Sequence, residues 1–285
     1  MQKRHQLLLA AALAPFLVQT ARAEGDSPWL PIPGQFALTL NASQQSGKSA
    51  YIGGALTPIS AITGGGASSY KRSTTTLRAD YGLSDAVALD ASVGQARVRV
   101  GAADNDDGPT DSALGLRWRV LDEFEDPTLP TLTLRAAAII KGSYNGARLA
   151  AVGKGGSGFE AAVVLGKMLG NNVSIWGELG VQDRDHGVPN ATFIDIGARW
   201  RFTRGWSASL GWSQRKFGGA LDIGGTGFSP ARFQQVREER SVVKFGLAWA
   251  VAGNQTLALN AAKTTSGRNT VKDDNALGLA YTFAF

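Results

Sequence analysis

Hydrophobic and polar residues alternate with a period of two in many separate stretches of this chain. In residues 275–285, Leu277, Leu279, Tyr281 and Phe283 occupy every second position, and small residues fill the positions between. A period of two is the side-chain period of a β-strand, so this segment has one apolar face and one small face. The same alternation recurs at 36–42, 75–81, 87–93, 114–120, 132–138, 159–165, 173–182, 194–202, 206–213, 243–249 and 257–261. The pattern predicts about twelve strands of roughly nine residues each.

Long and short links alternate between these segments. Polar or Gly/Ser-rich links lie at 44–73, 95–111, 142–158, 183–190, 217–238 and 264–274. Short links lie at 83–85, 170–172, 203–205 and 252–254, and a link of moderate length lies at 122–130. An even number of strands, with short periplasmic turns and long extracellular loops, is typical of bacterial outer-membrane barrels. The predicted fold is therefore all-β, a transmembrane up-and-down antiparallel β-barrel of about 12 strands.

The two faces of the predicted strands differ in charge and in aromatic content. Charged side chains in the middle of a segment fall on the face opposite the apolar one. A β-sandwich would show the same alternation, with its apolar face in a core. The aromatic residues favour the barrel, because they collect on the apolar face near the short turns, as in an interfacial girdle. These residues are Tyr81, Trp118, Trp200, Phe202, Trp206, Trp249, Phe283 and Phe285.

The N-terminal 23 residues have the pattern of a secretory signal peptide. Lys3 and Arg4 precede an apolar run from Leu7 to Val18, and Ala21 and Ala23 form an Ala-x-Ala cleavage site. We therefore expect residues 1–23 to be removed and residues 24–285 to form the outer-membrane barrel. The remaining chain holds 26 basic and 23 acidic residues, which gives little support to nucleic-acid binding. Cysteine is absent, which excludes disulfides and thiolate metal sites.

Ten charged residues on the inner face are the candidate lining of the lumen. One interpretation is a basic selectivity wall on the fourth and fifth strands that favours anionic or polarisable solutes. The alternative is that acids and bases on consecutive strands pair across the barrel, because closely packed lumen charges need partners or water. The ten residues are Arg78, Asp90, Arg117, Arg119, Arg135, Glu160, Glu178, Asp195, Arg199 and Lys244.

Catalysis has little support in the sequence. Some outer-membrane barrels are lipid hydrolases that resemble one another in pairing a His with Ser or Asp near the rim. Here His5 lies in the signal peptide, and His186 lies in a polar turn with Asp183 and Asp185 but without a neighbouring Ser. The run GKGGSG at 153–158 lacks the ending and the following helix of a phosphate-binding loop. We predict no enzyme, no cofactor and no metal site.

Three stretches resemble a known family of outer-membrane proteins. They are YGLSDAVAL (81–89), DSALGLRWRVL (111–121) and TLTLRAAAII (131–140), and they resemble the MetA-pathway phenol-degradation family. That family often has Pro-Thr-Gly after the fifth strand, whereas this chain has Lys141, Gly142 and Ser143. The resemblance implies an outer-membrane channel for aromatic or other small organic compounds. The segment Asn275 to Phe285 also resembles the C-terminal signal that the barrel-assembly machinery recognises.

The sequence thus predicts a channel or facilitator for passive uptake of small solutes, with aromatic or anionic organic compounds as candidates. Its expected partners are outer-membrane lipid and lipopolysaccharide, the assembly machinery and the solutes. The alternative function is a closed structural or surface-interaction barrel that works through the loops at 44–73, 142–158 and 217–238.

Overall fold

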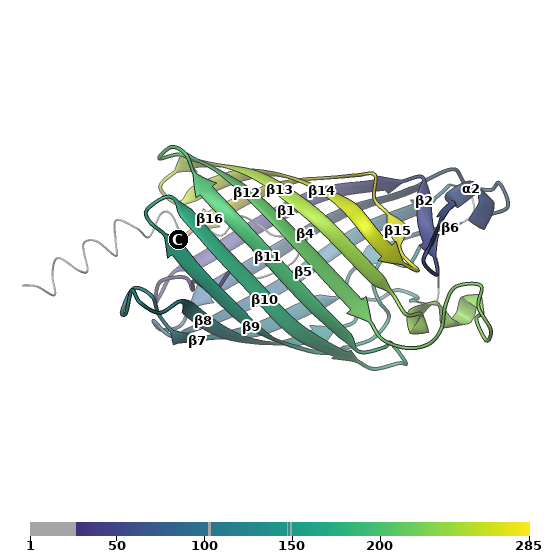
Figure 1. Cartoon of the computed structure of the whole chain (residues 1–285), viewed down its shortest axis with the longest axis horizontal. Helices are drawn as coiled ribbons and strands as arrows, with labels where there is room; N and C mark the ends of the chain where they lie inside the picture. The colour runs from purple at the N-terminus through teal and green to yellow at the C-terminus, as the bar shows by residue number, and fades with distance from the viewer. Residues whose placement is uncertain (1–26, 102–103, 147, 149) are drawn as a thin grey trace, which may run out of the picture.

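In the computed structural model, which describes residues 27–101, 104–146, 148 and 150–285, the chain forms a closed antiparallel β-barrel (Figure 1). β1 pairs with both β4 and β16, so the wall has no open edge. The predicted fold class is therefore confirmed. The twelve wall strands are β1 (Phe36–Gly47), β4 (Tyr70–Gly82), β5 (Val87–Val100), β7 (Ser112–Leu121), β8 (Thr131–Ile140), β9 (Gly158–Leu169), β10 (Val173–Arg184), β11 (Ala191–Arg201), β12 (Trp206–Phe217), β13 (Glu239–Ala252), β14 (Gln255–Arg268) and β16 (Asn275–Ala284).

The two ends of the barrel differ in the length of their connections. At the short-turn end, β1 begins, β16 ends and short links join the strands, as predicted. At the long-loop end, the connections carry small elements of their own, several of which gather beyond the wall strands in Figure 1. The small elements are β2 (Ser49–Ile52), β3 (Ala55–Pro58), α2 (Ile59–Ile62), β6 (Asp104–Pro109), η2 (Pro230–Gln235) and β15 (Val271–Lys272). No helix in the described part of the chain is long and apolar enough to span a membrane.

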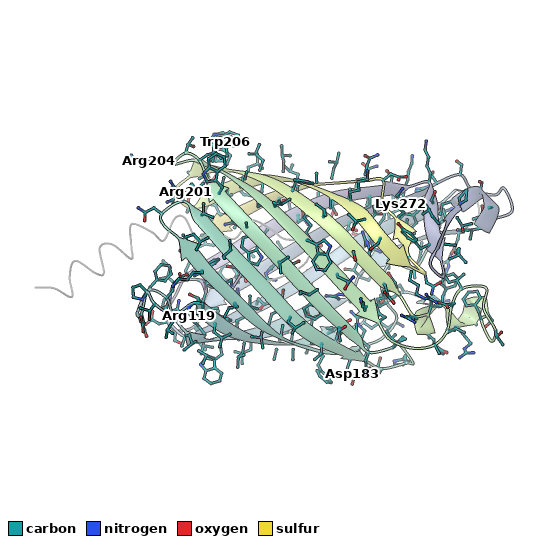
Figure 2. All side chains as sticks on the ribbon, viewed as in Figure 1. Arg119, Asp183, Arg201, Arg204, Trp206 and Lys272 are labelled. Carbon is teal, nitrogen blue, oxygen red and sulfur yellow. The ribbon has the colours of Figure 1, made fainter. Side chains whose placement is uncertain are left out.

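The outer surface of the wall is apolar and the interior is polar or small. Leu277 is 64% exposed and Trp118 51% exposed, whereas Ala280 and Thr282, on the other face of β16, are buried. A water-soluble protein rarely exposes so continuous an apolar surface, but a lipid-facing barrel requires it. The predicted aromatics lie at the short-turn end, where the rings of Trp206 and Trp249 stack with centroids 5.8 Å apart. In Figure 2, Trp206 lies at this end, opposite the end that holds Lys272.

Several strands run further toward the long-loop end than their alternation predicted. The segments 44–73, 95–111 and 264–274 are not loops throughout, because β1, β4, β5 and β14 extend into them. The polarity of the two faces reverses there. On β5, Val93 faces outward and Asp90 inward, but further along, Arg97 and Arg99 are exposed and Val98 is fully buried. Beyond the lipid-facing zone, the barrel is therefore built like a water-soluble protein.

A hydrophobic core packs inside the barrel at the long-loop end. It contains Val98 and Val100 from the wall, Ile59 from α2, and Ala150 and Val152 from the loop at 141–157. These side chains are fully or almost fully buried, so their burial removes apolar surface from water and fixes the loop against the inner wall. The long loops thus fold into the barrel mouth.

Candidate functional site in the barrel interior

Two acids and two arginines from β4, β5 and β7 form a compact cluster inside the barrel. Arg78 donates two hydrogen bonds of 3.0 Å to Asp80, and Arg117 Nη2 donates one of 2.6 Å. Asp90 lies 3.5 Å from each guanidinium. Gly115 lies opposite Asp90 and leaves room for that carboxylate, which a Cβ there would meet. Asp80 and Asp90 are direct cross-strand neighbours, so the two guanidiniums offset a repulsive pair.

A second cluster of charges spans β8, β9, β10 and β12. Arg135 contacts Glu160 directly and lies 3.9 Å from Glu178. The other Glu160 oxygen accepts a 2.7 Å hydrogen bond from the Gln182 amide and lies 3.5 Å from Arg215. Each carboxylate of this cluster is nearly buried, and charge-assisted hydrogen bonds compensate the loss of water around Glu160.

The remaining predicted lumen residues lie further round the wall. Lys244 on β13 contacts Asp195 on β11, and Arg199 is half-buried at an inward position of β11. Arg119 lies near the short-turn end, where it forms a 3.0 Å ion pair with Asp122. All ten predicted residues therefore occupy inward-facing positions, and the structure pairs most of them as the acid–base alternative expects. Their role in selectivity stays a prediction.

The wall from β12 round to β1 carries a row of small or uncharged residues. One register row joins Ser209, Gly246, Asn260, Gly278 and Ser43, which lie directly opposite one another on β12, β13, β14, β16 and β1. Small side chains leave space that arginines and glutamates would fill. The row therefore leaves more of the lumen open than the positions that carry arginine or glutamate.

At the short-turn end, the first described residues occupy the interior. Pro28, Trp29 and Leu30 are buried inside the barrel. The Trp29 indole donates a 2.8 Å hydrogen bond to Glu123, and the Thr133 hydroxyl donates one of 2.6 Å to the Pro28 carbonyl oxygen. A segment that precedes the first wall strand thus fills this end of the lumen.

A chamber of about 490 Å³ lies in the mouth at the long-loop end. The loop at 141–157 forms part of its wall, because Arg72 on β4 donates a 2.8 Å hydrogen bond to the Val152 carbonyl oxygen. Lys154 of the same loop contacts the Glu238 carboxylate, and its ammonium lies 4.5 Å from the centre of the Phe217 ring. The chamber therefore combines positive charge with an aromatic surface.

The surroundings of Lys154 are strongly positive. Partial burial of its amino group and the nearby guanidiniums of Arg184, Arg215, Arg240 and Arg72 lower the pKa of Lys154 below its usual value. Cations gather here, although Glu238 is a direct partner of Lys154. The chamber lining as a whole carries four cationic side chains and three carboxylates, namely Arg72, Arg148, Lys154 and Arg240 with Asp111, Glu238 and Asp273.

Several residues of the barrel interior could not be predicted from the alternation of apolar and polar positions in the sequence. Trp29, Lys154 and Glu238 lie in segments without a strand period, and Arg72 falls in a stretch predicted to be a loop. His186, the candidate of the weak catalytic interpretation, is exposed and lies 2.6 Å from its neighbour Asp185. In the described residues, no group of His, Cys, Asp and Glu could hold a metal ion. The predicted signal peptide lies outside the described residues.

Comparisons with known proteins identify the fold. No family model matches the chain, and no curated protein matches it. Among solved structures, it is similar to the COG4313 outer-membrane channel from Pseudomonas putida F1, with a TM-score of 0.73 and 16% identity over 93% of this chain and 100% of that one. The NanC porin has a TM-score of 0.52 and 11% identity over 86% and 98% of the two chains. The KdgM porin has a TM-score of 0.51 and 7% identity over 87% and 99%.

The chain therefore has the fold of outer-membrane β-barrel channels, as its alternation and motifs predicted. These neighbours are channels and porins rather than enzymes. Since no family model matches, the resemblance to the MetA-pathway family in particular stays a prediction.

Proposed function

We propose that this protein is an outer-membrane channel for passive uptake of small organic solutes, with aromatic and anionic compounds as its candidates. The observation that carries the proposal is the chamber at the long-loop end, beside a register row of small polar side chains along one wall. Eight strands leave an interior that side chains fill, and sixteen leave an open pore. Twelve strands, with small residues along part of the inner wall, leave room for a narrow path through the lumen. The structural neighbours named as channels and porins support this function.

Charge selectivity would come from the paired residues that still touch lumen water. Arg117 is fully buried, whereas the side chains of Arg78 and Lys244 are 25% and 22% exposed. We assign charge selectivity directly to Arg78 and Lys244. The other predicted lumen residues would contribute indirectly, by holding these two side chains in position. No catalytic step is part of the proposal.

The membrane orientation and partners follow from the same proposal. The long-loop end faces outward and the short-turn end faces the periplasm. The exposed aromatic belt contacts lipid, the long-loop end borders lipopolysaccharide, and the strand from Asn275 carries the assembly signal.

Single-channel recording in a planar bilayer tests the function. We expect discrete conductance steps from refolded residues 24–285, and a reversal potential under a salt gradient that shows anion preference. Arg78→Gln and Lys244→Gln should reduce that preference. Lys216→Gln, a matched change at an exposed outward position of β12, should leave it unchanged.

The alternative is a closed barrel that acts through its outer loops. The inward-folded loop at 141–157 and the buried segment at Trp29 favour it, because they narrow the two ends of the lumen. A silent bilayer, with the parent protein and a Trp29→Ala variant both shown to be folded and inserted, would overturn the channel and leave this alternative.

A further inference from the structure

The chamber in the barrel mouth has the size and lining of a binding site. Its volume of about 490 Å³ falls within the range of small-molecule pockets, roughly 300 to 1,000 Å³. Its walls come from β1, β4, β13 and the two long loops at 141–157 and 218–238. Several parts of the chain that are far apart in sequence thus meet around one cavity.

One cation of the chamber is held by neutral acceptors rather than by an acid. Arg72 donates to the Val152 carbonyl oxygen at 2.8 Å and to the Thr74 hydroxyl at 3.2 Å, and none of the described carboxylates forms an ion pair with it. By contrast, Lys154 contacts Glu238, and Arg240 contacts Asp273.

Two further arginines lie near the chamber without lining it. Arg184 and Arg215 lie close enough to Lys154 to lower the pKa of its ammonium. Each has its own acidic partner, Asp111 and Glu160 respectively. Arg72 is therefore the charge in this group that an incoming anion would neutralise.

The rest of the lining is mixed, with polar side chains from β1 and β4 on one part and apolar and aromatic side chains on another. Phe217, Phe233 and Val236 line the chamber beside these cations, and Ile59 and Tyr70 line it from α2 and β4. A hydrated inorganic anion would gain nothing from contact with the apolar surface, and a neutral hydrocarbon would form no ion pair with Arg72. The lining fits a molecule that carries one carboxylate on an apolar or aromatic body.

We propose that the mouth chamber binds small organic carboxylates, with the carboxylate on Arg72 and the apolar body against Phe217, Phe233 and Val236. The proposal rests on the proposed function, since it names the class of solute that the channel would take up. Binding at this depth would concentrate the solute at the outer entrance of the lumen.

Calorimetric titration of refolded residues 24–285 in detergent micelles tests the proposal. The probes are benzoate, its neutral analogue benzamide and its cationic analogue benzylamine. We expect benzoate to bind about tenfold or more tightly than benzamide, because only benzoate forms the charge-assisted pair with Arg72. Benzylamine should bind more weakly still. Equal binding of benzoate and benzamide would overturn the proposal.

Variants at adjacent positions of β4 locate the site. Arg72→Gln should weaken benzoate binding by about tenfold or more, and Arg72→Lys, which keeps the charge, should weaken it less. Lys71→Gln removes the same charge from the next residue, which is exposed on the outer face, and should have no effect. Heat-modifiable electrophoretic mobility reports whether each variant is folded. If Arg72→Gln does not fold, a folded Arg72→Lys variant with unchanged affinity would overturn the proposal.

Conductance of the same preparations separates this inference from the proposed function. A conducting protein that does not prefer benzoate would overturn the carboxylate site and keep the channel. A protein that binds benzoate through Arg72 but neither conducts nor takes up benzoate into proteoliposomes would keep the site and overturn the channel.

Discussion

Arg117 shows how a single residue holds the interior of this barrel together. Its guanidinium is fully buried between Asp80 and Asp90, two acids that face each other across neighbouring strands. Replacement by Gln would remove one of the two guanidiniums that lie beside these acids. Since removal of one partner from a buried ion pair costs about 3–5 kcal/mol, we expect Arg117→Gln to lower the free energy of unfolding by about 3 kcal/mol. Urea titration of the micelle-bound protein, followed by tryptophan fluorescence, measures this loss.

Arg119 provides a matched control two residues further along β7. It forms an ion pair with Asp122 near the short-turn end, outside the buried cluster. Arg119→Gln should lower the free energy of unfolding by less than Arg117→Gln does, because the Arg119 side chain is 16% exposed and borders one acid rather than two. In the Arg117→Gln background, Asp80→Asn and Asp90→Asn should restore part of the lost stability, because they remove the uncompensated charges. An Arg117→Gln variant as stable as Arg119→Gln would show that the cluster does not stabilise the fold.

At the scale of elements, the segment before β1 occupies the short-turn end of the lumen. Trp29 fills the lumen there and is held by Glu123, which also accepts a 2.8 Å hydrogen bond from the Met168 amide. Trp29→Ala removes the largest side chain of the segment and its hydrogen bond. We expect a larger single-channel conductance or a higher open probability in planar bilayers.

Trp118→Ala is the control for the Trp29 variant, because Trp118 is an exposed aromatic on the outer face of β7. Its loss should leave the conductance unchanged, although it weakens an anchor at the lipid interface. If Trp29→Ala and Trp118→Ala conducted like the parent protein, the segment would not be the constriction.

The elements also show what a sequence pattern can and cannot predict. Strand period and link length predict the wall strands and the sequence of long and short links, because one face of each strand must meet lipid and the other must not. This pattern does not predict the outer half of β5, because Arg97 points outward and Val98 inward once the strand leaves the lipid zone. The pattern also does not predict that Trp29 and Val152 are buried inside the barrel. They lie in segments without a period, and only the closed barrel brings them against the inner wall.

At the scale of the whole molecule, we expect the reversal of polarity along β5 to mark the edge of the membrane and the outward end. The chain has no cysteine, so a single introduced thiol is a unique label. We expect Arg97→Cys to react with a large, impermeant maleimide on intact cells, because Arg97 is exposed beyond the apolar zone. Arg204→Cys, in the short turn after β11, should react only after the outer membrane is permeabilised, since Figure 2 places Arg204 at the opposite end.

The variant Val93→Cys tests the position of the membrane boundary independently of the orientation of the barrel. Val93 is 53% exposed on the outer face of β5, four residues before Arg97, where lipid should shield it. This thiol should react only when detergent replaces the bilayer. Labelling of Arg204→Cys on intact cells would reverse the orientation, and labelling of Val93→Cys there would move the membrane boundary toward the short-turn end. The chamber lined by Arg72 faces external solutes only if both positions behave as expected.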